Sequence, residues 1–471
     1  MAFNLIEGDA GAVPLTVLSK AGLAAWRERA PARERDWAAA TGFTGEAGNV
    51  ALVPDKAGKL GRVLVGASEN DAAMWALAGP SENLPEGNYR LEQGPEGADP
   101  TRLALGWALG TYAFTLYRDK KKEYRARLVW PEGADRGLAE RLANAVCLAR
   151  DLINTPASDL GPAELAEAAV TVAENAGAKH RVITGDALLA ENYPTIHAVG
   201  RASIRQPRLV DIRWGDERAP KVTLVGKGVC FDSGGLDLKP ASGMRMMKKD
   251  MGGAAIMLGL AQAIMQGGLP VRLRVLLPLV ENAVSGNAMR PLDIVKTRKG
   301  ITVEIGNTDA EGRLILCDAL AEACTEQPAM IVDAATLTGA ARVALGPELP
   351  ALFCNDDKLA EGLTAAGSAE DDPMWRLPLW RSYRKLLDSK AADINNVSDG
   401  PHAGAITAAL YLQEFVEPGI PWAHLDVMAW NTKTRPGRPE GAEAQTLRAV
   451  YAYIAGRFAR SSSSHHNRAI P

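Results

Sequence analysis

The chain contains few cysteines and histidines for its length. Five cysteines and six histidines are present among 471 residues, and the cysteines are scattered through hydrophobic segments. An odd number of scattered cysteines is typical of reduced residues in a protein core, and it argues against a disulfide framework or a zinc knuckle. The cysteines are Cys147, Cys230, Cys317, Cys324 and Cys354.

Long apolar runs and a strong charge of one sign are also missing. No segment approaches twenty uninterrupted apolar residues, so we expect no membrane span. The N-terminus has no basic region followed by an apolar stretch, so we expect no signal peptide and a cytoplasmic protein. The net charge of −3 argues against nucleic acid as a partner. We interpret the lysine run at 120–122 as an exposed turn.

Alternating strand and helix patterns predict an α/β fold with two domains. The length and the 47% apolar content suffice for two cores. Residues 1–145 are expected to form a small α/β domain with an oligomeric or regulatory role. Residues 146–460 alternate more regularly, which predicts a larger C-terminal domain with a mainly parallel sheet flanked by helices. The polar tail 461–471 is expected to be disordered. Predicted elements of the first domain are strands at 50–53, 62–65 and 124–130 and helices near 101–116 and 138–152.

Two carboxylates and a guanidinium occur within five residues near the middle of the chain. Asp309, Glu311 and Arg313 lie between a β-branched, alternating strand pattern at 301–305 and a helical pattern that begins at Leu314. They therefore belong to a connection and a first helical turn, where backbone N–H groups are unpaired. Two such acids can hold a cation, and the arginine can hold an anion. The alternative is an ordinary acidic N-cap followed by a surface arginine.

A second polar cluster lies upstream. A hydrophobic strand leads into Lys227, which has a glycine on each side, and Asp232 follows. A lysine among apolar residues needs a carboxylate partner or loses its proton. Asp250 precedes a nearly all-apolar helix at 254–265, which must be buried. Taken alone, Asp250 fits a helix N-cap better than a metal ligand.

Together the two clusters bring four carboxylates to the ends of predicted strands. Such groups repel one another unless cations neutralise them. Two divalent ions that share bridging carboxylates would neutralise the group. A nearby dication can also lower the pKa of a lysine, so that its amine becomes a ligand. The oxygen-rich set lacks histidine and thiolate, so zinc, manganese, cobalt and magnesium all remain candidates. The four carboxylates are Asp232, Asp250, Asp309 and Glu311.

These motifs resemble the signature of the leucine aminopeptidase family, also called the cytosol aminopeptidases. Residues 307–314 match the family's hallmark octapeptide at every position, and residues 227–240 and 248–253 match with the family's internal spacing. The resemblance covers about residues 148–458, and such a combination is far more specific than a lone glycine-rich loop. Two further matching segments are 150–156 and 333–340.

The resemblance implies the ligands of two metal ions. Lys227, Asp232, Asp250 and Glu311 would bind one ion, and Asp232, Asp309 and Glu311 would bind the other. A water molecule that bridges two cations is acidified and becomes a nucleophile at neutral pH. The implied reaction is removal of the N-terminal residue from peptides, with a preference for leucine-like apolar residues.

The resemblance also implies two catalytic residues that bind no metal. Lys239 would stabilise the developing oxyanion with its positive charge. Arg313 would hold a bicarbonate that acts as general base. A homohexamer is implied by the resemblance alone.

By the same resemblance, five residues would line the pocket for the first side chain of the substrate. Met247 is flexible and polarizable, which suits several apolar side chains, although filling of the core is an alternative role. Met428 stands where many family members carry a smaller residue, so the pocket would be shallower if this side chain faced it. His424 is expected to be structural and not a ligand. The five pocket residues are Met247, Asn307, Thr336, Leu337 and Gly339.

Two other functions compete with an aminopeptidase. Clustered carboxylates also serve phosphoryl chemistry, so a metal-dependent phosphoesterase is one alternative. The lysine ligand and the complete octapeptide argue against it. The other is a non-enzymatic role in DNA binding or structure, but all the key positions are intact and the chain is acidic overall.

Overall fold

The computed structural model describes residues 3–69, 72–119 and 124–459. Its internal contacts divide the chain into two units. The N-terminal unit consists of Met1–Asn154 and Trp430–Glu443, and the C-terminal unit of Thr155–Ala429 and Ala444–Pro471. The predicted lysine turn and the predicted disordered tail lie outside the described residues. Within the described ranges, no helix is both long and apolar enough to span a membrane.

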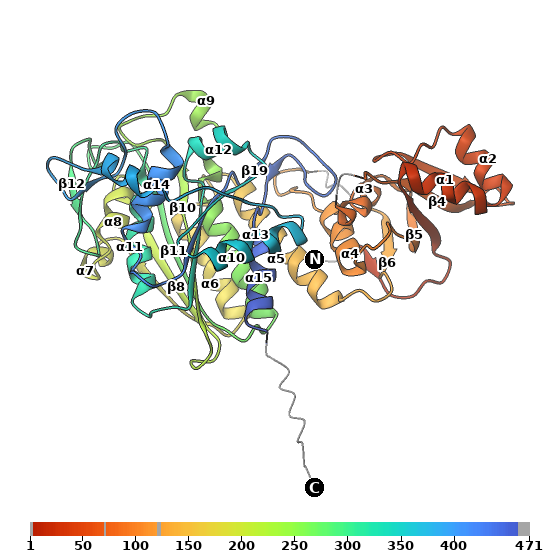
Figure 1. The fold of residues 1–471 in the computed structure, drawn as a ribbon, viewed down its shortest axis with the longest axis horizontal. Coiled ribbons are helices and arrows are strands. Elements are labelled where there is room, and N and C mark those ends of the chain that lie inside the picture. Colours follow the sequence, from red (N-terminus) through yellow and green to blue (C-terminus); the bar gives the residue numbers. More distant parts are fainter. Residues whose placement is uncertain (1–2, 70–71, 120–123, 460–471) are drawn as a thin grey trace, which may run out of the picture. The chain divides into compact units, whose positions relative to one another are not determined.

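A six-stranded sheet forms the centre of the N-terminal unit (Figure 1). The strand order is β1-β6-β5-β2-β4-β3, and all neighbours are parallel except β3 and β4. Leu15, Tyr89 and Trp107 are fully buried in its core. The strands are β1 (Leu5–Ile6), β2 (Val13–Leu18), β3 (Val50–Pro54), β4 (Leu60–Gly66), β5 (Gly87–Gln93) and β6 (Ala126–Val129).

Both predicted helices of this unit are present, but their bounds differ from the prediction. The helix predicted at 101–116 ends at Gly110, because the Thr111 hydroxyl donates a hydrogen bond to the Ala108 carbonyl (2.7 Å) and closes the last turn. The predicted helix at 138–152 is longer than expected and ends at Asn154. The helices are α1 (Lys20–Arg29), α2 (Ala32–Ala40), η1 (Ala73–Leu77), α3 (Pro80–Asn83), α4 (Pro100–Gly110) and α5 (Arg136–Asn154).

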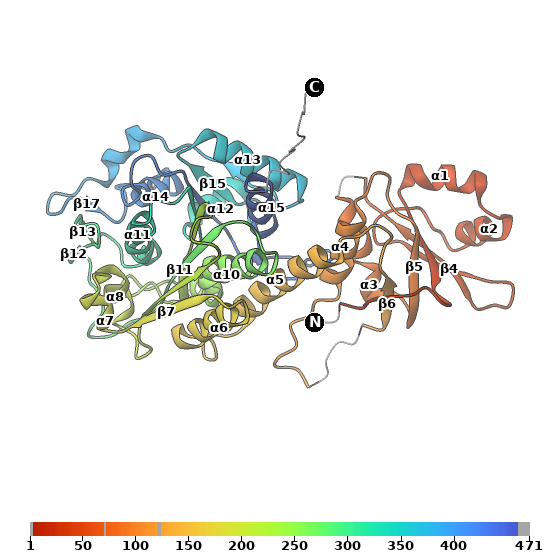
Figure 2. The ribbon, with the colours of Figure 1, turned by 90° about the horizontal axis from the view of Figure 1, so that it is seen from below.

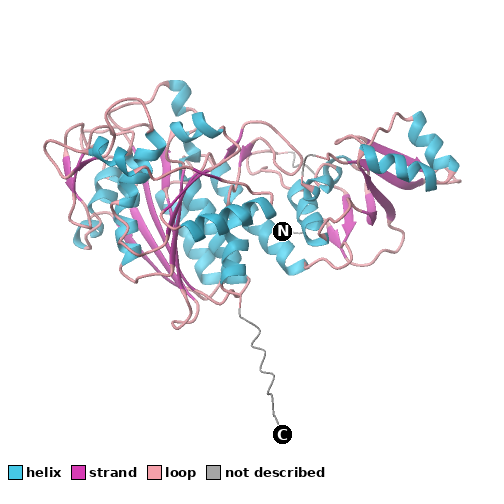
Figure 3. Cartoon of the chain, viewed as in Figure 1, coloured by secondary structure: helices cyan, strands magenta, loops and turns pink. Residues whose placement is uncertain are grey.

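A nine-stranded sheet organises the C-terminal unit (Figure 3). Its order is β16-β15-β18-β14-β9-β11-β8-β7, and β10 pairs with β11. The central strands β18, β14, β9 and β11 are parallel, and antiparallel pairs occur toward both edges. The α/β fold with a mainly parallel central sheet is therefore confirmed. The strands are β7 (Lys179–Thr184), β8 (Arg208–Trp214), β9 (Lys221–Gly226), β10 (Gly228–Asp232), β11 (Arg272–Asn282), β14 (Met330–Ala335), β15 (Ala351–Cys354), β16 (Trp375–Arg376) and β18 (Trp422–Asp426).

Helices cover both faces of this sheet (Figure 2). Helices α6, α10 and α15 pack together on one face, and α8, α11 and α14 pack on the other. The helix predicted at 254–265 is α10, and it is buried almost all round, as its composition required. All five cysteines are buried and free, which confirms their prediction as reduced core residues. The six helices are α6 (Pro162–Asn175), α8 (Pro194–Gly200), α10 (Gly252–Gln266), α11 (Glu311–Cys324), α14 (Gly404–Gln413) and α15 (Leu447–Arg457).

Shorter elements complete the two units. A three-stranded sheet of β12, β13 and β17 and a two-stranded sheet of β19 and β20 accompany the two large sheets. The short strands are β12 (Ile294–Lys296), β13 (Thr302–Glu304), β17 (Ile394–Asn395), β19 (Trp430–Asn431) and β20 (Gly441–Ala442). The remaining helices are α7 (Ala187–Ala190), α9 (Ala241–Met244), η2 (Met247–Met251), α12 (Gly339–Leu345), α13 (Asp357–Ala369) and η3 (Arg381–Leu387).

Candidate metal centre

The predicted site residues meet at the carboxyl end of the central strands. Lys227 directly follows β9, and Asp232 is the last residue of β10. Asp250 lies in η2, just before α10, and Glu311 is the first residue of α11. The carboxyl ends of parallel strands share one edge of a sheet, which is where ligands bind in open α/β folds.

Three of the carboxylates form a compact group. Asp232, Asp309 and Glu311 each present one oxygen, and these oxygens lie within 4.8 Å of one another. Asp232 and Glu311 are almost completely buried, and Asp309 is half-buried. Carboxylates this close repel one another strongly when all are charged. The group therefore needs positive charge around it.

Two lysines supply part of that charge by bridging carboxylates. The Nζ atom of Lys227 lies 2.6 Å from Asp250 Oδ2 and 3.0 Å from Glu311 Oε1. It also donates a hydrogen bond to the Thr336 carbonyl (3.1 Å). Lys227 thereby links the fourth carboxylate, that of Asp250, to the other three.

Lys239 bridges the other side of the group. Its Nζ atom lies 2.8 Å from Asp232 Oδ2 and also forms an ion pair with Asp309. Burial alone would lower the pKa of each lysine, but the neighbouring carboxylates outweigh it and raise both pKa values. Both side chains are therefore ammonium groups in this arrangement, and Lys227 can act as a neutral ligand only if further positive charge lowers its pKa.

The carboxylates remain short of positive charge despite these lysines. Burial, followed by repulsion from Asp232, raises the pKa of Glu311 to about 8 and that of Asp309 to about 6. The Oε2 atom of Glu311 is buried without a hydrogen-bond partner in the described part of the chain. A carboxylate oxygen without a hydrogen-bond partner, close to other carboxylate oxygens, provides ligand atoms that suit hard divalent cations. The residues present thus fit a metal site.

The capping alternative for the two acids that precede helices is wrong. Residue Ala310 is the N-cap of α11 and Met251 is the N-cap of α10, and neither helix has a side-chain capping bond. Asp250 instead accepts hydrogen bonds from Lys227 and from the Thr336 hydroxyl (2.7 Å). Its side chain is directed to the site and not to the helix that follows.

A glycine allows Lys227 to reach its partners. Gly312 follows Glu311 in the first turn of α11, and a Cβ atom at Gly312 would lie 2.4 Å from Lys227 Cε and 2.8 Å from Nζ. Such distances are far below van der Waals contact. The glycine of the octapeptide therefore makes room for the lysine side chain.

Two asparagines that the sequence motifs did not single out hold the site in place. Asn282, at the end of β11, donates hydrogen bonds to Asp232 Oδ1 (2.9 Å) and to the Thr308 carbonyl (3.1 Å). The Asn396 side chain accepts from the Gly306 amide (2.8 Å) and donates to the Asn307 carbonyl (2.8 Å). Neither asparagine lies near the acids in the sequence, so no local pattern could have revealed this role.

Arg313 lies in the first turn of α11 with its side chain almost fully buried. Its Nη1 donates to the Asn396 carbonyl (2.6 Å), and its Nε is buried without a partner among the described residues. Burial lowers the pKa of Arg313, although a guanidinium stays charged at any physiological pH. A buried guanidinium with a free donor is suited to holding a small anion.

The five predicted pocket residues lie on segments around this centre. Met247 is the first residue of η2 and Gly339 the first of α12. Thr336 and Leu337 follow β14, where Thr336 contacts Asp250 and the Leu337 amide donates to Asp426 (3.0 Å). The Asn307 side chain accepts from the Asp309 amide (2.7 Å) and so supports an acid of the cluster.

Two further residues were considered from the sequence. His424 is buried, and its Nδ1 lies 2.6 Å from Asp333 Oδ1, so it pairs on the sheet as expected for a structural histidine. Met428 is half-buried, and its amide donates to the Gln445 side chain (3.0 Å). Neither residue belongs to the carboxylate group.

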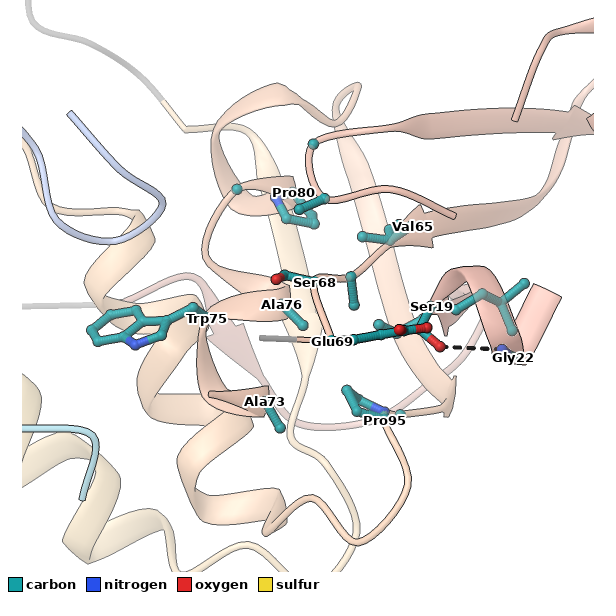
Figure 4. Close-up of a pocket in the computed structure, with 18 of the residues that line it drawn as sticks. Ser19, Gly22, Val65, Ser68, Glu69, Ala73, Trp75, Ala76, Pro80 and Pro95 are labelled. Carbon is teal, nitrogen blue, oxygen red and sulfur yellow. Dashed lines mark hydrogen bonds between the residues drawn. The ribbon is translucent and has the colours of Figure 1, made fainter. Parts of the chain in front are cut away.

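A separate hollow lies in the N-terminal unit, at the carboxyl ends of β2, β4 and β5 (Figure 4). It encloses about 680 Å³, and small apolar residues line most of it. Ser19 accepts a hydrogen bond from the Gly22 amide (3.1 Å) at the start of α1, and Glu69 accepts from the Ala21 amide (3.2 Å). Of the described residues, those lining this hollow include no group of three potential metal ligands, so the catalytic candidates belong to the C-terminal unit.

Comparisons with known proteins identify the family of the chain. The family model described as "Cytosol aminopeptidase family, catalytic domain" matches residues 147–451, and "M17 aminopeptidase, N-terminal domain" matches residues 13–131. A protein of Xanthobacter autotrophicus named "Probable cytosol aminopeptidase" is 45% identical over 347 residues, which are 71% of this chain and 69% of that protein.

Two solved structures share the fold over nearly the whole chain. The crystal structure of cytosol aminopeptidase from Coxiella burnetii has a TM-score of 0.93 and 49% identity, covering 97% of this chain and 99% of that one. The bottromycin maturation enzyme BotP in complex with Mn has a TM-score of 0.86 and 35% identity, covering 95% and 99%. The chain therefore belongs to the cytosol (leucine) aminopeptidase family and is a metal-dependent aminopeptidase.

Proposed function

We propose that the enzyme holds two divalent cations at this centre and removes leucine-like apolar residues from the N-termini of peptides. Lys227, Asp232, Asp250 and Glu311 would hold one ion, and Asp232, Asp309 and Glu311 the other. Manganese or zinc is the preferred assignment, with cobalt or magnesium as alternatives. The Mn complex of the related BotP supports manganese.

The observation that carries this proposal is the convergence of carboxylate oxygens within 4.8 Å. Four acids face two lysine ammonium groups, and Glu311 Oε2 has no hydrogen-bond partner among the residues described. Two bound divalent cations would acidify a water molecule and polarise the scissile carbonyl. Sharing Asp232 and Glu311 between the ions would satisfy the remaining oxygens.

Lys239 and Arg313 would act on the reacting groups directly. The Lys239 ammonium borders the carboxylate group, and its raised pKa keeps it charged at neutral pH. A fixed positive charge there would stabilise the oxyanion that forms when the carbonyl is attacked. The free Nε donor of Arg313 would hold a bicarbonate, which would accept the proton from the attacking water.

The pocket for the first side chain would be formed by Met247, Asn307, Thr336, Leu337 and Gly339. Met247 would adapt to several apolar side chains, since its thioether chain is flexible. If Met428 also faces this pocket, the pocket is shallower and the preference shifts from leucine to smaller residues.

We also propose a cytoplasmic homohexamer in which residues 1–145 serve assembly or regulation and residues 146–460 carry the catalytic site. The family matches to a separate N-terminal and catalytic domain support this division of roles. Peptides would be the substrates, and neither a membrane nor a nucleic acid would be a partner. Analytical ultracentrifugation would test the hexamer directly.

Hydrolysis of aminoacyl-p-nitroanilides by the metal-stripped protein tests the function. Activity should be absent before metal is added and should return with manganese, zinc or cobalt. N-acetylated substrates should remain intact, because the reaction needs a free α-amine. If none of the aminoacyl-p-nitroanilides is hydrolysed while metal is demonstrably bound, the proposal is refuted.

A further inference from the structure

The loop that carries Lys239 has little apolar packing of its own. It begins with two consecutive glycines, Gly234 and Gly235, whose φ angles of 89° and 68° lie in the left-handed region that glycine adopts without strain. Leu236 and Leu238, which follow, are 41% and 60% exposed, so their burial contributes little to fixing the loop. The position of the loop must therefore depend on polar contacts.

Asp237 and Thr308 supply such contacts in both directions. The Thr308 amide donates a hydrogen bond to Asp237 Oδ2 (2.7 Å), and the Asp237 amide donates one to Thr308 Oγ1 (2.8 Å). The Thr308 hydroxyl in turn donates to the Gly234 carbonyl (2.6 Å). Thr308 is completely buried and directly precedes Asp309. The pair thus joins the loop of Lys239 to the octapeptide segment, which carries two of the carboxylates.

Lys239 needs a fixed position because its charge acts on neighbouring groups. Its Nζ atom lies 2.8 Å from Asp232 Oδ2 and also forms an ion pair with Asp309. A lysine side chain is long and flexible, so the place of its ammonium group depends on where the loop backbone lies. Electrostatic stabilisation requires groups that are in place before the reaction, and a displacement of about 1 Å can lower the rate by a factor on the order of a hundred.

We propose that Asp237 is a positioning residue that, through Thr308, holds the Lys239 ammonium group beside the candidate metal centre. This inference rests on the proposed function, in which Lys239 stabilises the oxyanion. Asp237 itself is exposed and does not belong to the group of three carboxylates. It therefore acts on the reaction through the position of the loop and not as a metal ligand.

The first test is the effect of Asp237→Ala on the manganese-loaded enzyme with leucyl-p-nitroanilide as substrate. We expect kcat to fall by about tenfold to a hundredfold, because Lys239 is less well placed. KM and manganese content should stay near their wild-type values. Asp237→Asn should recover most of kcat, because an amide oxygen can still accept a hydrogen bond from the Thr308 amide.

Asp216→Ala is the matched control. Asp216 Oδ1 also accepts a hydrogen bond from a backbone amide, that of Arg218 (2.9 Å), in an exposed loop. This loop precedes β9, whereas Lys227 follows the other end of that strand. The control variant should therefore keep wild-type kcat. Wild-type kcat in Asp237→Ala, or loss of its bound manganese, would overturn the inference.

A double-mutant cycle separates positioning from general damage. If Asp237 acts through Lys239, Asp237→Ala should have little further effect on kcat in the Lys239→Ala enzyme. Loss of one group that stabilises an oxyanion costs about 10²–10³ in kcat, so the remaining turnover can be measured at high enzyme concentration. An equal loss of kcat in the wild-type and Lys239→Ala backgrounds would overturn the inference.

Failure of the inference can be distinguished from failure of the proposed function. If the wild-type enzyme hydrolyses leucyl-p-nitroanilide but Asp237→Ala does so equally well, only the positioning role is refuted. If Lys239→Ala keeps full activity, the proposed role of Lys239 fails, and the role of Asp237 fails with it. If the manganese-loaded wild-type enzyme hydrolyses none of the aminoacyl-p-nitroanilides, the proposed function itself is refuted.

Discussion

Substituting the glycine inside the octapeptide gives a quantitative test of how the centre is built. In Gly312→Ala, the new Cβ would lie 2.4 Å from Lys227 Cε, whereas ordinary contacts begin near 3.4 Å. The lysine chain would therefore have to move by about 1 Å, the difference between these distances. It is fixed by Asp250, Glu311 and the Thr336 carbonyl, so it cannot move without losing at least one of them.

The energetic balance favours a destabilised protein. Overpacking of a buried site lowers the free energy of unfolding by about 1–3 kcal/mol. The better helix propensity of alanine raises it by about 1 kcal/mol at most. We therefore expect the free energy of unfolding to fall by up to about 2 kcal/mol. Displacement of a proposed ligand should also weaken manganese binding by about tenfold or more.

Thermal unfolding and manganese titration measure these two effects. Gly456→Ala is the matched control, because Gly456 also lies in a helix (α15) but has nothing within 4 Å of its Cβ position. That change should be neutral or stabilise the protein by up to about 1 kcal/mol, with unchanged manganese affinity. Wild-type manganese affinity and turnover in Gly312→Ala would refute the reasoning about Lys227.

Three further predictions concern the same centre. Glu311→Ala and Asp232→Ala should each abolish turnover and reduce bound metal measured by mass spectrometry, since each removes a proposed shared ligand; full activity in Glu311→Ala would contradict the two-ion proposal. Arg313→Ala should lower kcat while metal content stays nearly intact, and loss of metal there would indicate a structural role instead. Burial raises the pKa of Glu311 to about 8 and that of Asp309 to about 6. Acids with raised pKa values destabilise the metal-free fold as the pH rises from their unfolded values through their folded ones. Because bound cations must displace these protons, and also the Lys227 proton where that amine becomes a ligand, manganese affinity in equilibrium dialysis should increase between pH 6 and 8 by about tenfold per pH unit for each proton displaced; an affinity independent of pH would refute this linkage.

The fold class and the location of the site could be predicted because both depend on local patterns. Alternating strands and helices predict a parallel sheet, and polar residues placed directly after hydrophobic strands must gather at one edge of it. Lys227 after β9 and Asp232 at the end of β10 follow this rule. The buried helix α10 was equally clear, because its composition is apolar on every side.

The supporting contacts could not be predicted, because they join residues far apart in the sequence. Asn282 forms a hydrogen bond with Asp232, which lies fifty positions earlier in the sequence. Asn396 forms hydrogen bonds with the loop before α11, which lies about ninety positions earlier. An asparagine has no periodicity or spacing that distinguishes such a role from an ordinary turn. Helix α4 ends early because the Thr111 hydroxyl donates a hydrogen bond to the Ala108 carbonyl in the last turn. A helical pattern of apolar residues does not predict such a bond.

The charge of the centre gives a physical reason to expect bound cations. When all four buried or half-buried acids are ionised, the ammonium groups of Lys227 and Lys239 leave two negative charges in excess. If Lys227 becomes a neutral ligand, one divalent cation still leaves a negative charge, whereas two leave a single positive charge. One small anion such as hydroxide or bicarbonate would balance that charge, and the Nε of Arg313, which has no partner among the described residues, offers a donor for it. Removing Asp232 or Glu311, the two acids that the ions are proposed to share, should therefore disable the whole centre, since no remaining side chain replaces the lost negative charge.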